Sequence, residues 1–464
     1  MAEIFTRKFS EVSGGRFDPE FYIGQTIQIA TYPLKNFVKI KSGKRIPKGR
    51  SYANTTTTYK YLRVDDLDSE ILEIDIDKLK SIDKDIFTLL EHYEIHNDEV
   101  ALSIAGTIGK VFIFHNTTSN RVILTENCVK LQAQDNLLPK FLSLILKTDF
   151  LQSQMKRQYI QTTIPKLAIE RIKELQIPSI PPLSTQQHII DLMDKAYKAK
   201  QEKENKAKEL LDSIDSYLLE ELGIILPLRA NNTLDSRIYT QKISALSGSR
   251  FDANYHQPYY KKFEQALESG KYKTLRLVDI CQFRRGSFPQ PYGNQEWYGG
   301  ANAMPFVQVA DIDDNFKLKE KTNQQISQLA QPKSVFVSQN TIILSIQGTI
   351  GRVAITQYDC YVDRTIAIFT ELSNLLNQHF LAYMLSILFK NKADTARGIT
   401  LKTITKEEFR NFKIPLPPLT EQERIAKEIS QRKAQAKALK QEAKELLESA
   451  KKEVEHIILG VFER

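Results

Sequence analysis

One long segment of this sequence occurs twice in tandem. The matching stretches are 3–18 with 237–252, 102–114 with 344–356, and 177–187 with 414–423. In the first pair 9 of 16 positions are identical, and in the second, LSIAGTIGKVFIF against LSIQGTIGRVAIT, 9 of 13 are identical. The repeat length of about 235–240 residues is far longer than that of a solenoid or a propeller. The chain therefore contains two whole domains of one kind, which present two similar surfaces to two similar targets.

Composition and cysteine usage are those of a globular protein from a reducing compartment. Of the 464 residues, 41% are apolar and 26% are charged, which is ordinary for folded domains. Cys128, Cys281 and Cys360 are far apart, which argues against a disulfide framework or a thiolate zinc site. The first residues lack the apolar core of a signal peptide, and the longest apolar run, 380–389, is too short to cross a bilayer. We expect a soluble cytoplasmic protein with no membrane partner.

The charge balance is compatible with a nucleic-acid partner but does not require one. Lys and Arg number 65 against 56 Asp and Glu, which gives a net charge of +9. An excess of this size bears on partners and not on the fold.

Each repeat has the same order of predicted elements. A mixed segment of about 175 residues, rich in Ile, Val, Phe, Tyr and Thr, comes first. Within it, KYLRVDDLD (60–68) and PFVQVADID (305–313) are typical of strands that enter turns. The stretches 138–157 and 376–390 have helical periodicity. A proline block follows, IPSIPPL or IPLPPL, whose missing N–H donors and fixed φ predict an extended joint.

A long helix is predicted after each proline block. Ser184 and Thr420 directly follow the proline blocks and are suitable N-cap residues. No proline or glycine interrupts the chain from there to Leu222 or to Leu459. Apolar residues recur at alternating spacings of four and three in both stretches, which is typical of a coiled coil.

Polar residues interrupt the two apolar stripes at different places. Lys200 and Lys203 lie in the first stripe and Arg432 lies in the second. Such interruptions select a partner and a register. We therefore expect the two helices to pair with each other, antiparallel, and the alternative is that each helix folds back onto its own domain.

With these features the sequence resembles the DNA-specificity subunit of type I restriction–modification systems. The resemblance covers essentially the whole chain and is strongest at IPLPPLTEQERIAKEI (414–429), of which IPSIPPLSTQQHIIDLM is a degraded first copy. It also rests on the paired GTIG segments, and on RFDPEFY (16–22), RFDANYH (250–256) and GSFPQPYGNQEWYGGANAMPFVQVADI (286–312).

The resemblance implies an α+β fold with two tandem target recognition domains. Each domain is followed by a long helix, and the two helices pair as an antiparallel coiled coil with pseudo-twofold symmetry. The expected boundaries are 1–180 and 229–416 for the recognition domains, and 181–228 and 417–464 for the spacer helices.

The resemblance also implies a function without catalysis. In that family each recognition domain reads one half of a split double-stranded DNA site, and the helices dock two methyltransferase subunits. Motor–nuclease restriction subunits join for cleavage. The chain itself would then hold no cofactor, because S-adenosylmethionine for adenine methylation, ATP and Mg belong to the partner subunits. In keeping with this, the sequence has no Walker A loop and no DPPY or NPPF motif.

Two loops at equivalent repeat positions carry the predicted DNA contacts. The first loop (residues 39–52) and the second loop (281–300) combine cations with aromatic rings, which suits phosphate neutralisation and arginine–guanine contacts. Their sequences differ, as two different half-sites require. The alternative is a solvated basic loop with core aromatics. The predicted residues are Lys41, Lys44, Arg45, Lys48, Arg50 and Tyr52, and then Arg284, Arg285, Ser287, Tyr292, Trp297 and Tyr298.

Other candidate residues lie at the GTIG segments and along the helices. The glycine amides of GTIG, with Lys110 or Arg352 behind them, approach a phosphate, form a tight turn between strands, or do both. His92 and His96 supply only two ligands, so no metal site is predicted. The helix residues predicted to serve partner binding are Ile189, Met193, Leu210, Ile214, Ile425, Ile429, Leu439 and Leu446.

Two other functions are compatible with the same features. One is the specificity subunit of a bipartite methylase–nuclease that lacks a translocating motor. The other is a scaffold whose paired domains bind two proteins through these loops. Salt dependence separates DNA from protein targets, because phosphate contacts weaken steeply with ionic strength.

Overall fold

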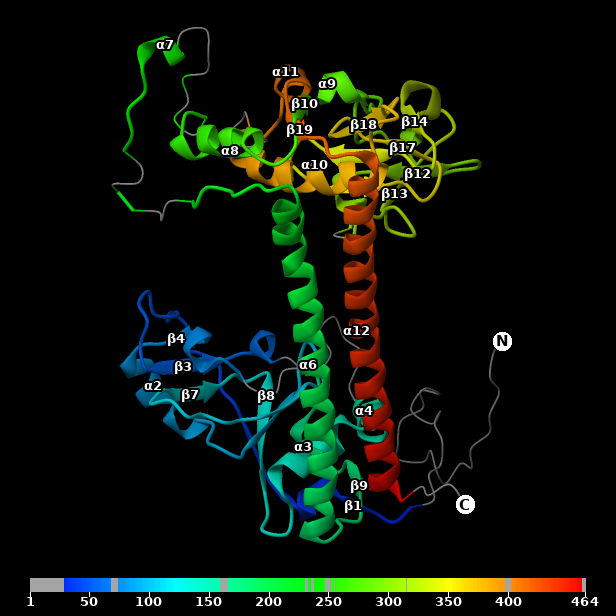
Figure 1. The fold of residues 1–464 in the computed structure, drawn as a ribbon. Helices are drawn as coiled ribbons and strands as arrows, with labels where there is room; N and C mark the ends of the chain where they lie inside the picture. Colours follow the sequence, from blue (N-terminus) through cyan, green and yellow to red (C-terminus); the bar gives the residue numbers. More distant parts are fainter. Residues whose placement is uncertain are drawn as a thin grey trace. The chain divides into compact units, whose positions relative to one another are not determined.

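The structure, a computed structural model, describes most of the chain as two compact units (Figure 1). The described residues are 29–67, 74–158, 166–229, 233–234, 238–246, 251, 253, 255–313, 315–396 and 402–460. The stretches 3–18 and 16–22 lie outside them, as do parts of 237–252 and 250–256. The first unit comprises residues 1–203 and 441–464, and the second comprises 204–440. Each of the two long helices is therefore shared between both units.

The first head, Thr31–Pro178, is closed by the antiparallel pair β1 (Thr31–Pro33) and β9 (Gln176–Pro178). A four-stranded antiparallel sheet has the order β2-β8-β5-β6, and a three-stranded sheet has the order β4-β3-β7 with β3 and β7 parallel. The strands are β2 Val38–Ser42, β3 Tyr59–Leu62, β4 Lys80–Ser81, β5 Val100–Ser103, β6 Val111–Ile113, β7 Arg121–Leu124 and β8 Cys128–Ala133. The helices are α2 Lys84–Leu90, α3 Pro139–Lys147, α4 Asp149–Gln158 and α5 Ile169–Lys173, with 3-10 turns η2 Leu34–Asn36, η3 Val64–Asp66, η4 Ile76–Lys78 and η5 Glu91–Tyr93.

The second head, Thr274–Pro415, repeats this plan and is closed by β10 (Thr274–Arg276) and β19 (Lys413–Pro415). Its sheets have the orders β11-β18-β15-β16 and β13-β12-β17-β14. The strands are β11 Gln282–Arg285, β12 Met304–Val307, β13 Gln324–Ile326, β14 Val335–Val337, β15 Ile342–Ser345, β16 Val353–Ile355, β17 Cys360–Val362 and β18 Ile366–Thr370. The helices are α9 Leu277–Ile280, α10 Gln378–Lys392 and α11 Lys406–Arg410, with 3-10 turns η7 Gln295–Trp297, η8 Val309–Asp311, η9 Gln331–Lys333 and η10 Ala393–Thr395. Helices α7 (Ile243–Leu246) and α8 (Pro258–Glu268) precede the head.

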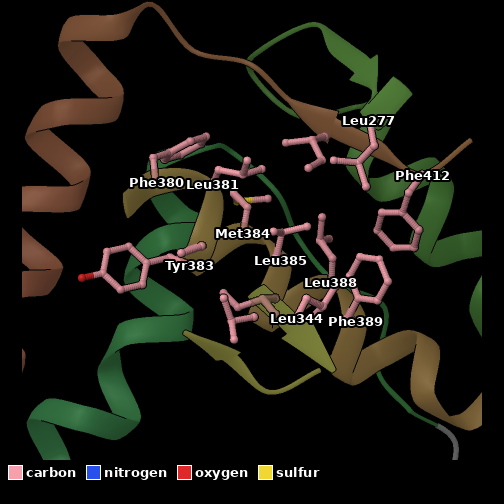
Figure 2. Packing of buried hydrophobic residues seen from close by; sticks show 14 of the residues in the cluster. Leu277, Leu344, Phe380, Leu381, Tyr383, Met384, Leu385, Leu388, Phe389 and Phe412 are labelled. Atoms are coloured by element: carbon pink, nitrogen blue, oxygen red, sulfur yellow. The ribbon is translucent and has the colours of Figure 1, made fainter. Parts of the chain in front are cut away.

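The apolar stretches predicted as helices form the centres of the two cores. In the second head α10 is buried on all sides from Phe380 to Phe389, and Figure 2 shows its leucines packed between Leu277, Leu344 and Phe412. In the first head the corresponding prediction, 138–157, is two helices, because Thr148 adopts an extended conformation between α3 and α4. Burial of each large apolar side chain contributes about 1.5–3 kcal/mol, so these helices hold the sheets in place.

The long helices α6 (Leu183–Glu221) and α12 (Leu419–Leu459) run antiparallel within each unit, as predicted (Figure 1). In the first unit the Nζ of Lys203 lies 2.6 Å from the carboxylate of Glu442. In the second unit Arg424 forms an ion pair with Glu221, and the guanidinium of Arg432 donates to the hydroxyl of Ser213. From the first contact to the second, the residue number rises by eight in α12 and falls by eight in α6, as antiparallel helices require. Two of the predicted polar interruptions, Lys203 and Arg432, are thus bound across the helix pair.

The predicted N-cap residues are wrong by two positions. Helices α6 and α12 begin at Leu183 and Leu419, because the carbonyls of Pro182 and Pro418 already accept the first intrahelical hydrogen bonds. Ser184 and Thr420 therefore lie inside the first helical turn and do not cap it.

A buried glutamine in each first turn fixes the helix to its head instead. The amide of Gln186 is fully buried, accepts from the N–H of Leu138 at 2.9 Å, and donates to the carbonyls of Asn136 and Pro181 at 2.8 Å. Gln422 makes the same three bonds in the second unit, with Asn377, Leu375 and Pro417. Each glutamine ties a proline joint to the loop before the core helix of its head.

Candidate nucleic-acid interface

A glycine brings each predicted recognition loop into contact with a turn of the neighbouring sheet. Gly43 follows β2 and Gly286 follows β11. A Cβ at Gly43 would lie 2.0 Å from the carbonyl oxygen of Thr125, and one at Gly286 would lie 2.2 Å from that of Val362. Both obstructing atoms belong to the backbone, so only glycine permits this approach.

The two turns that the loops contact are structurally equivalent. We call residues 125–127 the first junction turn and residues 363–365 the second. The N–H of Gly43 donates to Cys128 and that of Gly286 to Ile366, at 3.0 Å in both heads. The N–H groups of Cys128 and Ile366 close their turns on Thr125 and Asp363, at 3.1 Å in both heads. The framework beneath the two predicted loops is therefore the same.

The first loop presents its cations to solvent. Arg45 has a side chain that is 79% exposed, and its Nε donates to the carboxylate of Glu126 in the first junction turn at 2.5 Å. This hydrogen bond raises the pKa of Arg45. Arg50 forms an ion pair with Asp85. All six residues predicted in this loop are exposed, namely Lys41, Lys44, Arg45, Lys48, Arg50 and Tyr52.

The second loop is built on packed aromatic rings. The ring of Phe288 stacks on Tyr292 at 5.1 Å and on Tyr298 at 5.3 Å between ring centroids. Trp297 is buried beneath the ammonium group of Lys333, which lies 4.7 Å from its ring. The predicted aromatic residues of this loop are therefore partly or wholly buried, and they give the loop a rigid base.

The predicted polar residues of the second head lie on and just beyond β11. Arg284 and Arg285 are exposed, and they donate to the carbonyl of Phe336 at 3.1 Å and to the side chain of Gln347 at 3.4 Å. Ser287 is half-buried and donates to the carbonyl of Lys333. The second head therefore places a pair of arginines where the first head has Lys41.

The GTIG segments form tight turns between β5 and β6 and between β15 and β16. Gly106 and Gly109 have φ of 75° and 88°, and the corresponding glycines of the second head have 77° and 93°, which favours glycine. The two side chains that follow are engaged within the chain. Lys110 donates to the carbonyls of Val64 and Leu67, and Arg352 donates to the carbonyl of Ile312. In both heads this contact joins the GTIG turn to the 3-10 turn after β3 or β12.

Sequence reasoning missed Glu126 and Arg364, which occupy the same place in the two junction turns. Glu126 holds Arg45, whereas the guanidinium of Arg364 lies 5.1 Å from the ring centroid of Tyr292. The signal was present in the repeat, because LTEN at 124–127 corresponds to VDRT at 362–365. No motif marks these residues, and they reach the loops through the antiparallel pairing of β2 with β8 and of β11 with β18.

The helix residues predicted to bind partners lie on the inner faces of α6 and α12. Ile189, Met193 and Leu446 belong to the apolar core of the first unit, and Ile214, Ile425 and Ile429 belong to that of the second. Because they are largely covered within the chain, a partner on these helices would contact the exposed positions between them. Buried are Ile189, Met193, Ile214, Ile425 and Ile429, and half-buried are Leu210, Leu439 and Leu446.

His92 and His96 are exposed. Among the residues that the structure describes, no three His, Cys, Asp or Glu side chains gather as ligands for a metal ion. Within the same ranges, no helix combines the length and the apolar character needed to span a bilayer.

Comparisons with known proteins agree with this architecture. A model of the type I restriction modification DNA specificity domain matches residues 27–212 and again 269–449. A type I restriction enzyme specificity subunit of Methanocaldococcus jannaschii is 22% identical over 363 residues, covering 76% of this chain and 74% of the relative. The EcoBI specificity subunit of Escherichia coli is 24% identical over 168 residues, 35% of either chain.

A solved structure shares the fold. It is described as "Structural basis underlying complex assembly and conformational transition of the type I R-M system", and the likeness covers 93% of this chain and 96% of that one, with a TM-score of 0.54 and 18% identity. The two family matches together span well over half of the sequence. The chain belongs to the family of type I restriction–modification DNA specificity subunits and carries two recognition domains.

Proposed function

We propose that each head reads one half of a split double-stranded DNA target, and that the first and second loops make the contacts. One observation carries this proposal: the two heads share a framework down to matching hydrogen bonds at Gly43 and Gly286, yet differ in the loops placed on it. A common framework would place each loop in the same way against the DNA groove, while different side chains select different bases. A bipartite, asymmetric target follows from such a pair.

Charge supports DNA as the target. The first loop carries exposed cations at Lys44, Arg45 and Lys48, and β11 carries Arg284 and Arg285. These groups suit neutralisation of phosphates, which dominates affinity for DNA. The net charge of +9 favours association with a polyanion.

We further propose that the chain catalyses nothing alone and works with two methyltransferase subunits docked along α6 and α12. The support is the internal repeat, because two similar helix–head junctions present equivalent surfaces to two copies of one partner. S-adenosylmethionine would be bound by those partners, and ATP and Mg by motor–nuclease restriction subunits. The assembled complex would act in the cytoplasm, which contains the DNA. The three free thiols are compatible with that reducing compartment.

The test is to co-express the chain with its neighbouring methyltransferase and to map modified adenines across the host genome. A two-part motif with a fixed gap is expected. A stable complex that adds no modification would contradict the proposal and favour a protein-binding scaffold. Binding of a target duplex should also weaken with salt, with a slope of log K on log salt near −0.9 per neutralised phosphate. A flat response would exclude DNA as the target.

Exchange of one head separates modular reading from joint reading. Replacement of residues 30–175 by the corresponding segment of another family member should change one half of the motif and leave the other half and the gap intact. A change in both halves would contradict independent reading by the two heads.

A further inference from the structure

In each head an arginine lies at the contact between the loop and the junction turn. In the first head this arginine belongs to the loop, and in the second head it belongs to the turn. The first head takes Arg45 from the loop and holds it with Glu126 of the turn. The second head takes Arg364 from the turn and holds it on Tyr292 of the loop. We call the two contacts the first and second loop–turn junctions.

The support under Arg364 is rigid. The hydroxyl of Tyr292 donates to the carboxylate of Asp363, which is 3% exposed, and burial together with this bond raises the pKa of Tyr292. The other oxygen of Asp363 accepts from the N–H of Thr365 at 2.8 Å and from its hydroxyl at 2.6 Å. The ring of Tyr292 is stacked on Phe288. The ring is therefore held by its hydrogen bond to Asp363 and by its packing on Phe288.

The contact with the Tyr292 ring leaves the N–H groups of the Arg364 guanidinium available. Arg364 is exposed, and within the part of the chain that the structure describes no carboxylate pairs with it and no acceptor binds its N–H groups. A planar guanidinium carries N–H donors in a fixed fork that can bind two acceptors side by side. That geometry matches the O6 and N7 acceptors of guanine in the major groove.

Arg45 is presented in a comparable way by a different device. Glu126 accepts from the Nε of Arg45, which leaves the two terminal nitrogens for another acceptor, and the side chain is 79% exposed. Glu126 is thus a positioning residue for Arg45, as Tyr292 is for Arg364. In both cases the contact favours one placement of the guanidinium, which lowers the ordering cost of binding.

We propose that these two junction arginines are specificity-determining residues, Arg45 for the first half-site and Arg364 for the second, and that each reads a guanine. The inference rests on the proposed function and deepens it. Arg45 belongs to the loop whereas Arg364 belongs to the junction turn, so the guanidinium lies at a different place relative to the rest of the loop in the two heads. The guanine therefore falls at a different place in the two half-sites.

The experiment uses the full chain assembled with its methyltransferase subunits and a duplex library randomised in both half-sites. Methylation is read by sequencing. For Arg364→Ala we expect a loss of about tenfold or more in discrimination at one guanine of one half-site, with the other half-site and the gap unchanged. Arg364→Lys keeps the charge but not the bidentate geometry and should not restore discrimination. Arg45→Ala should do the same in the opposite half-site.

The positioning residues give a second readout. Glu126→Ala should lower discrimination at the same base pair as Arg45→Ala, and Glu126→Gln should give a smaller loss there. A purely structural role would instead lower activity evenly over all sequences. The control is Arg276→Ala, which removes an exposed arginine of β10 that pairs with Asp279 and should leave the motif unchanged.

Two results would overturn the inference. One is an unchanged motif and discrimination in Arg364→Ala. The other is uniform weakening over all library members with a salt slope reduced by about one, which identifies a phosphate contact. If the wild-type complex itself yields no bipartite motif, the proposed function fails, and that result is distinct from both.

Discussion

Substitution of Gly286 by alanine should destabilise the second head and leave a clear spectroscopic signature. The new Cβ would lie 2.2 Å and 2.3 Å from the carbonyl oxygens of Val362 and Asp363, closer than Cβ atoms approach in folded proteins. Because both obstacles are backbone atoms, loop and junction turn must separate by about 1 Å, and overpacking of this kind costs about 1–3 kcal/mol. Weakening of the Gly286–Ile366 hydrogen bond adds about 0.5–1.5 kcal/mol. The expected total is about 1.5–4.5 kcal/mol.

The assay is urea unfolding followed by tryptophan fluorescence. Trp297 is the sole tryptophan of the chain and is buried in the second loop, so its emission reports on this head. Gly293→Ala is the matched control, because nothing lies within 4 Å of a Cβ there, and its midpoint should shift by the equivalent of less than about 1 kcal/mol. If Gly286→Ala unfolds at the wild-type urea concentration, the close approach does not constrain the loop and the reasoning is refuted.

Three further predictions concern buried polar groups. Gln186→Leu leaves three backbone groups unpaired and should destabilise the first unit by about 2–4 kcal/mol in thermal melts, whereas Gln187→Leu, on the exposed side, should be near neutral. Burial and the nearby charge of Lys451 lower the pKa of Lys147 from 10.5 to about 8 in the folded protein. Between pH 8 and 10.5 this lysine is therefore protonated in the unfolded chain but not in the folded protein, and the free energy of unfolding rises with pH in that range. Lys147→Met should therefore be more stable by about 2–3 kcal/mol at pH 7, with the difference shrinking above pH 8; a constant difference would contradict the shift. Burial raises the thiol pKa values to about 12, so labelling at pH 8 should require unfolding for Cys128, Cys281 and Cys360.

The sequence predicted the elements whose signals are local. The apolar run at 380–389 is a core helix, the GTIG glycines form turns with positive φ, and the heptad stripes pair antiparallel. Each of these follows from periodicity or from a residue with special backbone freedom. The break at Thr148 was not predicted, because nothing in the local pattern forbids a continuous helix there.

The parts that escaped prediction depend on contacts between distant segments. Glu126 and Arg364 have no distinctive neighbours in the sequence, and their place beside the loops is set by the pairing of β2 with β8 and of β11 with β18, which are distant in the sequence. Lys110 looked like a phosphate ligand, but its ammonium group meets the carbonyls after β3. Gln186 belongs to a motif whose prolines predicted the extended joint. The sequence did not indicate that its buried amide donates to the carbonyls of Asn136 and Pro181.

The division of the long helices between the units has a consequence for synthesis. The second unit is one uninterrupted stretch, 204–440, whereas the first combines residues up to 203 with those from 441 onward. Leu447, Val454 and Ile458 complete the core that contains Phe141 and Ile189. On the ribosome, the head that emerges first thus waits for the last helical turns before its hydrophobic interior is closed, and the head that emerges second can finish earlier.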